Sequence, residues 1–379
     1  MTSKEITPIK RKRIHWMDNL RTFIIFLVVL YHAGGVYEST GVWTSFWLVL
    51  DPATNGVAGI VNVIINIFMM PVLFFISGYL TPMSVQGKDG WAFLKARFRR
   101  LIVPWIIAVL TVIPLYKVIF LYSRGLPQQN WTTYFHFVPG NISSQNWLWF
   151  LPVLFLFNVV YLLLAKAGIR FPDISRTAAV LLVAIVGLVY SMSVGFVFGA
   201  GSWTHSPVLD FENERLLVYF MIFLLGALHF RQDAFAAKPK DKVLYVVASS
   251  VAWIPVTIYF FALLVPFIMP GGSLINPVVD RILYWVTYYV SLLCLMYVVI
   301  GTFWRYLDRT GRVRSELNQN SFYVYIIHVV VIGVIALLLR NTALPSVLKY
   351  LTLVVTAYVL SNLIVSLARR AGAGIRARG

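Results

Sequence analysis

Two side chains that could do chemistry lie on one apolar stretch near the start of the chain. Arg21 and His32 are eleven residues apart, and the residues between them are almost all apolar. On an α-helix, eleven residues turn through about 1100°, which puts both side chains within roughly 20° of one face and about 16 Å apart along the axis. Histidine exchanges a proton near neutral pH, so His32 is a candidate acid or base, while Arg21 could hold an anion.

Composition places this stretch in a membrane. Of the 379 residues, 59% are hydrophobic and 12% are charged, and the mean hydropathy is +0.79. A chain with so little polar surface cannot enclose itself as a water-soluble globule. In a membrane helix, Arg21 would lie at one edge of the bilayer and His32 past its midplane, where an ionisable group is expensive and marks a functional site.

Ten apolar stretches are long enough to cross a bilayer as helices, which predicts an all-α, polytopic helical bundle. They cover approximately residues 20–36, 58–80, 101–122, 147–165, 178–198, 216–230, 243–269, 282–301, 321–339 and 350–368. The seventh contains Pro255 and Pro266, so we expect a kink, a re-entrant turn or a strong tilt there. The chain then divides into a basic arm (1–19), one membrane domain (20–368) and a basic tail (369–379).

The loop charges predict an orientation. Most of the 32 Lys and Arg residues fall in the arm, the tail and the loops on the amino-terminal side of the expected bundle. By the positive-inside rule, both termini lie in the cytoplasm and the protein is a multi-pass protein of the cell membrane, inner or plasma. The net charge of +18 is therefore explained without nucleic acid as a partner. The opposite loops collect acidic, Trp and Asn residues, which favours a polar, sugar-like partner.

Cysteine usage excludes a thiolate site. The single cysteine, Cys294, lies inside an apolar run, so we expect neither a disulfide nor a metal site, and no metal is needed. The first apolar stretch lacks a small-residue cleavage site, so we expect an uncleaved start. Asn130 and Asn141 begin glycosylation sequons in an outward loop, which matter only in a glycosylating host.

Four motifs, in order along the chain, resemble those of the membrane acyltransferase 3 family. The run from Met17 to His32 resembles the family's first-span signature of a basic residue, ten others and a histidine. The other three are residues 74–80 (FFISGYL), 97–104 (RFRRLIVP) and 321–328 (SFYVYIIH). Residues 149–151 and 225–228 are similar to the branch with the glucan-modifying protein C and the fucose O-acetylase-like members. The chain lacks a Glu just after the Trp-rich start of the fourth span, which argues against peptidoglycan as acceptor.

The resemblance implies transfer of an acyl group, acetyl or succinyl, from cytosolic acyl-CoA to a hydroxyl of an extracytoplasmic or lipid-linked glycan. A sugar hydroxyl is a poor nucleophile at neutral pH, and His32 would be the general base that takes its proton. Asp18 would orient Arg21, which lies three residues further along the helix. The attack would be direct, with an acyl-imidazole intermediate as the alternative.

The same resemblance suggests where the acyl donor binds. Arg97 and Arg100, at helical spacing i, i+3 on the cytoplasmic edge, could present two guanidinium groups to the CoA phosphates. Arg99 flanks that pair, and Arg21 could hold the pantetheine or pyrophosphate end. All of these cations also fit a structural alternative, because positive-inside residues and interfacial ion pairs are common at membrane edges.

Further polar residues are candidates for the substrate path and the acceptor side. We expect Ser77, Tyr79, Tyr325 and His328 to line the path, and Trp203 and His205 to contact the acceptor. Structural alternatives stay open for these residues: Ser77 could simply allow close helix packing, His328 could bridge two helices, and His205 could lie in a solvated loop.

Two rival functions remain open at the level of sequence. A proton-coupled transporter or flippase for a lipid-linked or anionic solute would also use proline-broken helices and a deep histidine. A sensor without catalysis is the other rival. Membrane lipid is an expected partner, and the sequence leaves a homo-oligomer open.

Overall fold

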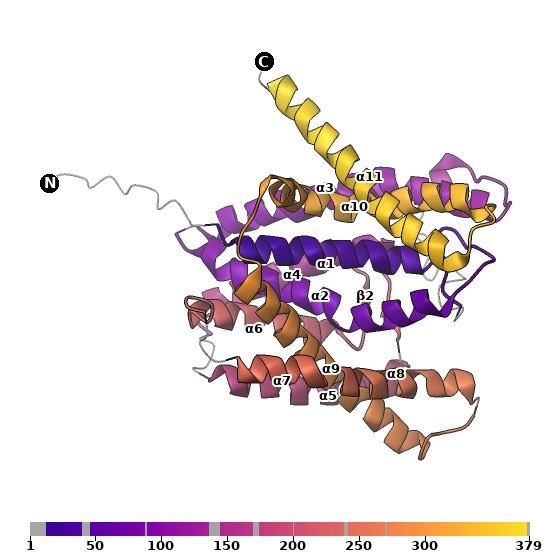
Figure 1. Cartoon of the computed structure of the whole chain (residues 1–379). Coiled ribbons are helices and arrows are strands. Elements are labelled where there is room, and N and C mark those ends of the chain that lie inside the picture. The colour runs from indigo at the N-terminus through magenta and orange to yellow at the C-terminus, as the bar shows by residue number, and fades with distance from the viewer. Residues whose placement is uncertain are drawn as a thin grey trace.

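A computed structural model describes residues 13–39, 46–87, 89–135, 145–169, 174–199, 201–238, 242–269 and 271–376. In these ranges the chain forms eleven α-helices, two 3-10 helices and one short hairpin (Figure 1). The elements are α1 (His15–Gly34), α2 (Gly56–Val85), α3 (Gly90–Ser123), η1 (Trp131–Phe135), η2 (Asn146–Trp149), α4 (Phe150–Lys166), α5 (Arg176–Phe198), β1 (Trp203–Thr204), β2 (Phe211–Glu212), α6 (Leu216–Arg231), α7 (Val243–Val251), α8 (Trp253–Ile268), α9 (Pro277–Tyr306), α10 (Arg312–Arg340) and α11 (Ser346–Arg376).

The described part of the chain contains eight helices long and apolar enough to cross a membrane. These are α2, α3, α4 with η2, α5, α7 joined to α8, α9, α10 and α11. Helix α6 is apolar but has only 16 residues. Helix α1, with 20 residues, carries Asp18, Arg21 and His32 and is not among the eight. The expected helical membrane bundle is confirmed, whereas the count of ten and the cytoplasmic position of both termini stay predictions.

Side-chain caps start several of these helices. Asn55 and Asp89 accept hydrogen bonds from the first-turn N–H groups of α2 and α3. Asn276 does the same for α9, and Pro277 follows it at the first helical position, where its missing N–H costs nothing. These caps explain why α2, α3 and α9 begin before their apolar stretches do.

The seventh apolar stretch is broken at Ala252. Helix α7 ends at Val251 and α8 begins at Trp253. Pro255 has no N–H to donate to the carbonyl of Val251, so the break falls where the proline removes a helical hydrogen bond. The interruption agrees with an irregular seventh stretch, while the kink, the re-entrant turn and the strong tilt all stay predictions.

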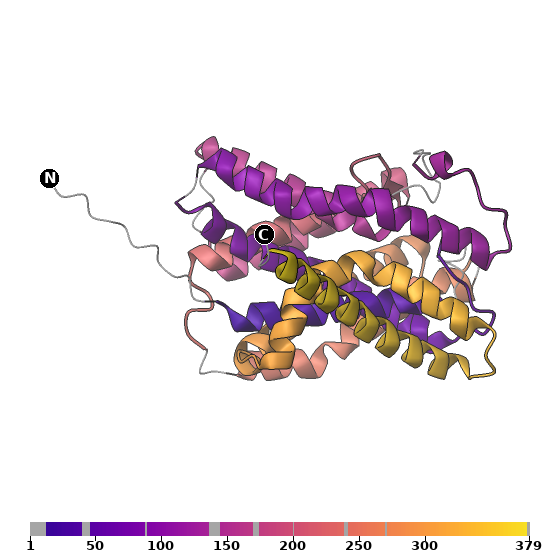
Figure 2. The same ribbon diagram turned by 90° about the horizontal axis from the view of Figure 1, so that it is seen from above.

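Helix α1 lies in the middle of the bundle. It packs against α2, α9, α10 and α11, and Figures 1 and 2 show it running alongside α10 with α11 across them. Its buried stripe includes Leu20, Ile24 and Val28, which are at most 1% exposed and follow the i, i+4 spacing of one helix face. Helix α9 runs obliquely from this layer to the layer of α5, α7 and α8 (Figure 1). The central position of α1 gives its polar side chains neighbours on several sides.

Helices α2 and α6 approach each other closely at two glycines. A Cβ at Gly78 would overlap the backbone carbonyl of Phe223, and one at Gly226 would overlap the backbone of α2 at Phe75. Small residues let membrane helices approach until their backbones touch. Gly78 therefore allows close helix packing. This agrees with the structural alternative stated for its neighbour Ser77.

We expect Gly78→Ala to destabilise the bundle, because the added methyl group meets backbone that cannot rotate away. Overpacking of this kind costs about 1 to 3 kcal/mol. Gly59→Ala is the matched control in the same helix, since nothing lies within 4 Å of its added Cβ. Relief of glycine's entropy should stabilise that control by about 0.5 to 1 kcal/mol. Denaturant titration in detergent measures both free energies of unfolding, and equal values would contradict the packing argument.

Candidate active site

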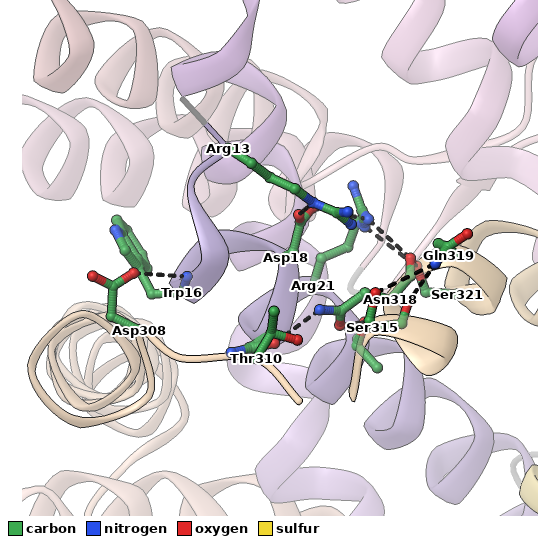
Figure 3. Close-up of polar contacts among 12 residues, drawn as sticks. Arg13, Trp16, Asp18, Arg21, Asp308, Thr310, Ser315, Asn318, Gln319 and Ser321 are labelled. Atoms are coloured by element: carbon green, nitrogen blue, oxygen red, sulfur yellow. Dashed lines mark hydrogen bonds and ion pairs between the residues drawn. The ribbon is translucent and has the colours of Figure 1, made fainter. Parts of the chain in front are cut away.

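The Asp18–Arg21 end of α1 carries an ion pair and reaches α10 (Figure 3). Asp18 lies 3.2 Å from Nη2 of Arg21 and 2.6 Å from Nε of Arg13. Arg21 also donates from Nε to the hydroxyl of Ser321 at 3.3 Å and from Nη2 to the carbonyl of Asn318 at 3.2 Å. Arg21 is thus fixed from both helices, with its guanidinium still partly exposed.

A buried amide network lies beside this ion pair. Asn318 of α10 accepts from the Thr22 hydroxyl at 2.6 Å and donates to the side chain of Asn19 at 2.8 Å. Asn19 in turn donates to the carbonyls of Leu307 and Arg309 in the connection between α9 and α10. Polar groups that bond across helices in an apolar bundle fix the register of the two helices. No role was expected for these residues from the sequence.

The other polar contact between α1 and α10 is a pair of histidines. Nε2 of His328 lies 3.0 Å from Nδ1 of His32. Nδ1 of His32 is also 2.8 Å from the carbonyl of Val28. Nδ1 of His328 faces the carbonyls of Tyr325 at 2.7 Å and Val324 at 3.2 Å. His328 is fully buried, whereas His32 is partly exposed.

The partners assign the tautomers of both rings. Carbonyl oxygens only accept, so Nδ1 of His328 carries the hydrogen and its Nε2 accepts in the neutral ring. Nδ1 of His32 faces that acceptor and a carbonyl, so it too carries the hydrogen. The lone pair of neutral His32 is therefore on Nε2, the nitrogen that could take a proton.

Aromatic rings enclose the histidine pair. Trp47, fully buried in the segment after α1, stacks on His32 with centroids 5.3 Å apart and an interplanar angle of 14°. The Tyr325 ring lies 6.1 Å from that of His328, and its hydroxyl donates to the carbonyl of Trp147. Trp147 donates from Nε1 to α10 in turn. Of the expected residues, His328 contacts His32 directly and Tyr325 contacts His328. Trp47 and Trp147 were missed because only the folded chain brings them there.

Ser77 and Tyr79 lie elsewhere. Tyr79 packs against the rings of Phe230 and Phe235, with centroids 5.4 and 5.5 Å away. Ser77 is half-buried on α2, and its carbonyl accepts from Thr81. Among the described residues, neither side chain makes a hydrogen bond or ring contact to the histidine pair. Their role on a substrate path stays a prediction.

The three arginines expected to bind the donor lie near the start of α3. Arg99 and Arg100 are exposed, and Arg97 is half-buried, with its guanidinium 5.2 Å from the centroid of the Phe93 ring. Arg100 is close enough to interact electrostatically with both Arg97 and Arg21. Arg100 thus joins Arg97 and Arg21 in one positive region at this end of the bundle, which favours an anion there.

A cavity of about 280 Å³ also opens at this end. Its lining comes from α1, α9, α10 and α11 and the connection after α9: Asn19, Thr22, Phe23, Phe26, Phe303, Leu307, Arg314, Leu317, Asn318 and Tyr358. None of the predicted donor arginines lines it. The cavity therefore adds Arg314, not Arg97 or Arg100, to the residues accessible there.

The candidates for the acceptor side lie on the hairpin after α5. Strands β1 and β2 are antiparallel, with Trp203 opposite Glu212. The Trp203 ring is exposed and stacks on that of His205, with centroids 6.2 Å apart at 12°. Nδ1 of His205 is 3.6 Å from the Asp210 carboxylate. Burial raises the pKa of Asp210, although the N–H of Ser206 and His205 work to lower it. His205 is thus held by an ion-pair partner, and contact with an acceptor stays a prediction.

A buried ion pair at the end of the hairpin was not expected from the sequence. The Glu212 carboxylate lies 3.0 Å from Nε of Arg215, whose guanidinium is 5.0 Å from the centroid of Tyr288. Burial raises the pKa of Glu212, and Arg215 opposes the shift by favouring the carboxylate. Both charges interact electrostatically with Tyr31, the neighbour of His32. The pair thus lies close enough to the histidine end of α1 to act on Tyr31 electrostatically.

Two further expectations concern metal and glycosylation. Across the ranges that the structure describes, no group of three His, Cys, Asp or Glu side chains is placed to hold a metal ion. That no metal is used stays a prediction. Asn130 lies just before η1, and the Asn141 sequon lies outside the described residues.

This fold and this site define a multi-pass helical membrane protein with a histidine pair inside the bundle. The chain belongs to the acyltransferase 3 family, since the family's sequence profile, described as an acyltransferase domain, matches residues 14–367. The family resemblance that the motifs indicated is thus confirmed. No solved structure matches the chain.

Curated relatives carry the name glucans biosynthesis protein C. Those from Salmonella schwarzengrund (strain CVM19633), Salmonella paratyphi B and Salmonella typhi are each 24% identical to the chain over 237 residues. The match covers 59% of this chain and 60% of each relative. The chain thus spans less than two thirds of the length of these relatives.

We expect Glu212→Gln to lower the stability of the protein strongly, because it leaves Arg215 as a buried charge without its carboxylate. Breaking such a pair costs about 3 to 5 kcal/mol. Glu316→Gln is the control: its pair with Arg369 is 3.4 Å long and partly exposed, and is worth about 0 to 1 kcal/mol. Thermal unfolding in detergent compares the two, and an equal loss would show that the buried pair has no special weight.

Proposed function

We propose that this membrane acyltransferase moves an acyl group, acetyl or succinyl, from cytosolic acyl-CoA to a hydroxyl of an extracytoplasmic or lipid-linked glycan. The observation that supports it best is the histidine pair, whose partners leave the lone pair of His32 on Nε2. His32 would be a base inside an apolar bundle, and Arg21 lies on the same helix at the membrane edge. This arrangement suits a donor that enters from one side and an acceptor that enters from the other.

The reaction would proceed by direct attack. Nε2 of His32 takes the hydroxyl proton while the oxygen attacks the thioester carbonyl, and the tetrahedral intermediate then expels the CoA thiolate. The imidazolium returns its proton to that thiolate, so the products are the ester and CoA. During the step, Nδ1–H of His32 keeps donating to Nε2 of His328 and to the carbonyl of Val28, which stabilises the charged ring.

The cations at the other end of α1 would bind the donor. Arg21, Arg97 and Arg100 repel one another, and CoA phosphates between them would relieve that repulsion. The rise of about 16 Å between Arg21 and His32 is a distance that the pantetheine arm would have to cover. In this arrangement the Arg21 end faces the cytoplasm of the inner or plasma membrane. A glycan acceptor is favoured by the relatives' name, which refers to glucan biosynthesis.

We expect His32→Ala to lower kcat by about 10²- to 10⁴-fold, the usual contribution of a general base, with insertion and CoA binding retained. His229→Ala is the matched control. Nδ1 of His229 makes the same bond to the carbonyl four residues earlier, at 2.8 Å, but its ring packs on Phe75 and Phe235. Transfer of labelled acyl groups from acyl-CoA to candidate glycans is the measurement. Full activity of His32→Ala, or solute uptake into liposomes without acyl transfer, would contradict the proposal.

We expect the double substitution Arg97→Ala, Arg100→Ala to raise the KM for acyl-CoA, because two charge-assisted contacts to phosphate are lost. Each is worth about 1.5 to 3 kcal/mol, so the rise should exceed tenfold. Lys95→Ala, which removes an exposed cation from the same turn region of α3, should leave KM nearly unchanged. A donor dependence equal to that of the unsubstituted protein would remove both arginines from the site.

A further inference from the structure

A cavity with charged walls lies at the end of the bundle opposite Arg21, where α3 and α10 both finish (Figure 2). Its volume is about 690 Å³. Its lining includes Ser123, Arg124, Val334, Leu338 and Arg340. One wall is therefore cationic, and the other is an apolar face of α10 on which Val334 is 48% and Leu338 74% exposed.

The two guanidinium groups of this cavity are held close together by neutral oxygen atoms. Arg124 donates to the carbonyl of Trp47 at 2.8 Å and to the Ser123 hydroxyl at 3.1 Å, and Arg340 donates to the carbonyl of Ser123. Burial lowers the pKa of Arg124, and repulsion from Arg340 adds to that effect. Two cations fixed side by side favour an anion between them.

Near this cavity, the carboxylate of Asp51 is paired with Lys349. Asp51 is buried and lies 2.9 Å from Nζ of Lys349, which also donates to the carbonyl of Arg340 at 3.0 Å. No carboxylate among the described residues lies within ion-pair distance of the Arg340 guanidinium. The Asp51–Lys349 pair thus holds the end of α10 in place while the charge of Arg340 faces the cavity.

We propose that this cavity binds the phosphate-bearing head of a membrane amphiphile, with Arg124 and Arg340 on the phosphate and the chain along Val334 and Leu338. Guanidinium groups bind phosphate oxygens through paired, charge-assisted hydrogen bonds. The exposed apolar face beside them is what distinguishes a lipid phosphate from a free one, because inorganic phosphate would gain nothing from it.

The cavity is joined to the histidine pair through one residue. Trp47 accepts the hydrogen bond of Arg124 on its carbonyl and stacks its ring on His32. An anion that binds Arg124 therefore affects Trp47, the residue whose ring stacks on the proposed base His32. This step alone rests on the proposed function; binding of the amphiphile does not.

The test measures binding to the full chain in neutral detergent without acyl donor. The probes are dioleoyl phosphatidate, dioleoylglycerol with the same chains but no phosphate, and inorganic phosphate. We expect saturable binding of phosphatidate only, weakened about tenfold or more by Arg124→Ala with Arg340→Ala. Arg281→Ala, which removes an exposed cation from the start of α9, is the control and should bind normally.

A second variant covers the case in which the arginine substitutions impair folding. Leu338→Glu places a carboxylate beside the cations on an exposed position, so it should abolish phosphatidate binding and leave the fold intact. Phosphatidate binding that survives Leu338→Glu overturns the proposal, as does equal binding of inorganic phosphate or of dioleoylglycerol. Because no acyl donor is present, such a failure does not bear on the proposed acyl transfer. Full activity of His32→Ala, which would contradict that transfer mechanism, does not bear on phosphatidate binding.

Discussion

The contact between His328 and His32 joins α10 to α1, although the two residues are 296 positions apart in sequence. The rest of the site depends on this contact. An imidazole placed in an apolar bundle must satisfy its N–H, since an unsatisfied polar group there costs several kcal/mol. Here each ring does so with backbone carbonyls of its own helix and with the other ring. These contacts define one tautomer of His32. Mobile water around the ring would not select between the two tautomers.

The same two helices are tied at their other end by Arg21 to Ser321 and by Thr22 to Asn318. These bonds prevent α1 from sliding or turning against α10, so the guanidinium and the imidazole keep their separation. In the proposed mechanism, this fixed separation positions an acyl donor held at one end against a base near the other. The Glu212–Arg215 pair acts electrostatically on Tyr31 near the histidine end of α1.

Much of this arrangement was predictable from local patterns. Helical periodicity placed Arg21 and His32 on one face, the prolines predicted the break between α7 and α8, and spacing put Tyr325 and His328 together. What escaped were contacts between separate segments of the chain, such as Trp47 over His32 and Asn318 with Asn19. No periodicity encodes these pairs, because each depends on which helices become neighbours. Tyr79 is the opposite case. Its motif resembles that of the family, which predicted a place on the substrate path, but its ring packs against Phe230 of α6.

The polar character of α1 has a consequence for biosynthesis. The ribosome makes α1 before α10, yet groups that bond to Arg21 and His32 belong to α10, about 300 residues later. At the rates usual for translation, about 5 to 20 residues per second, tens of seconds separate the two helices. A nascent chain therefore holds an incompletely bonded α1 until α10 has been made.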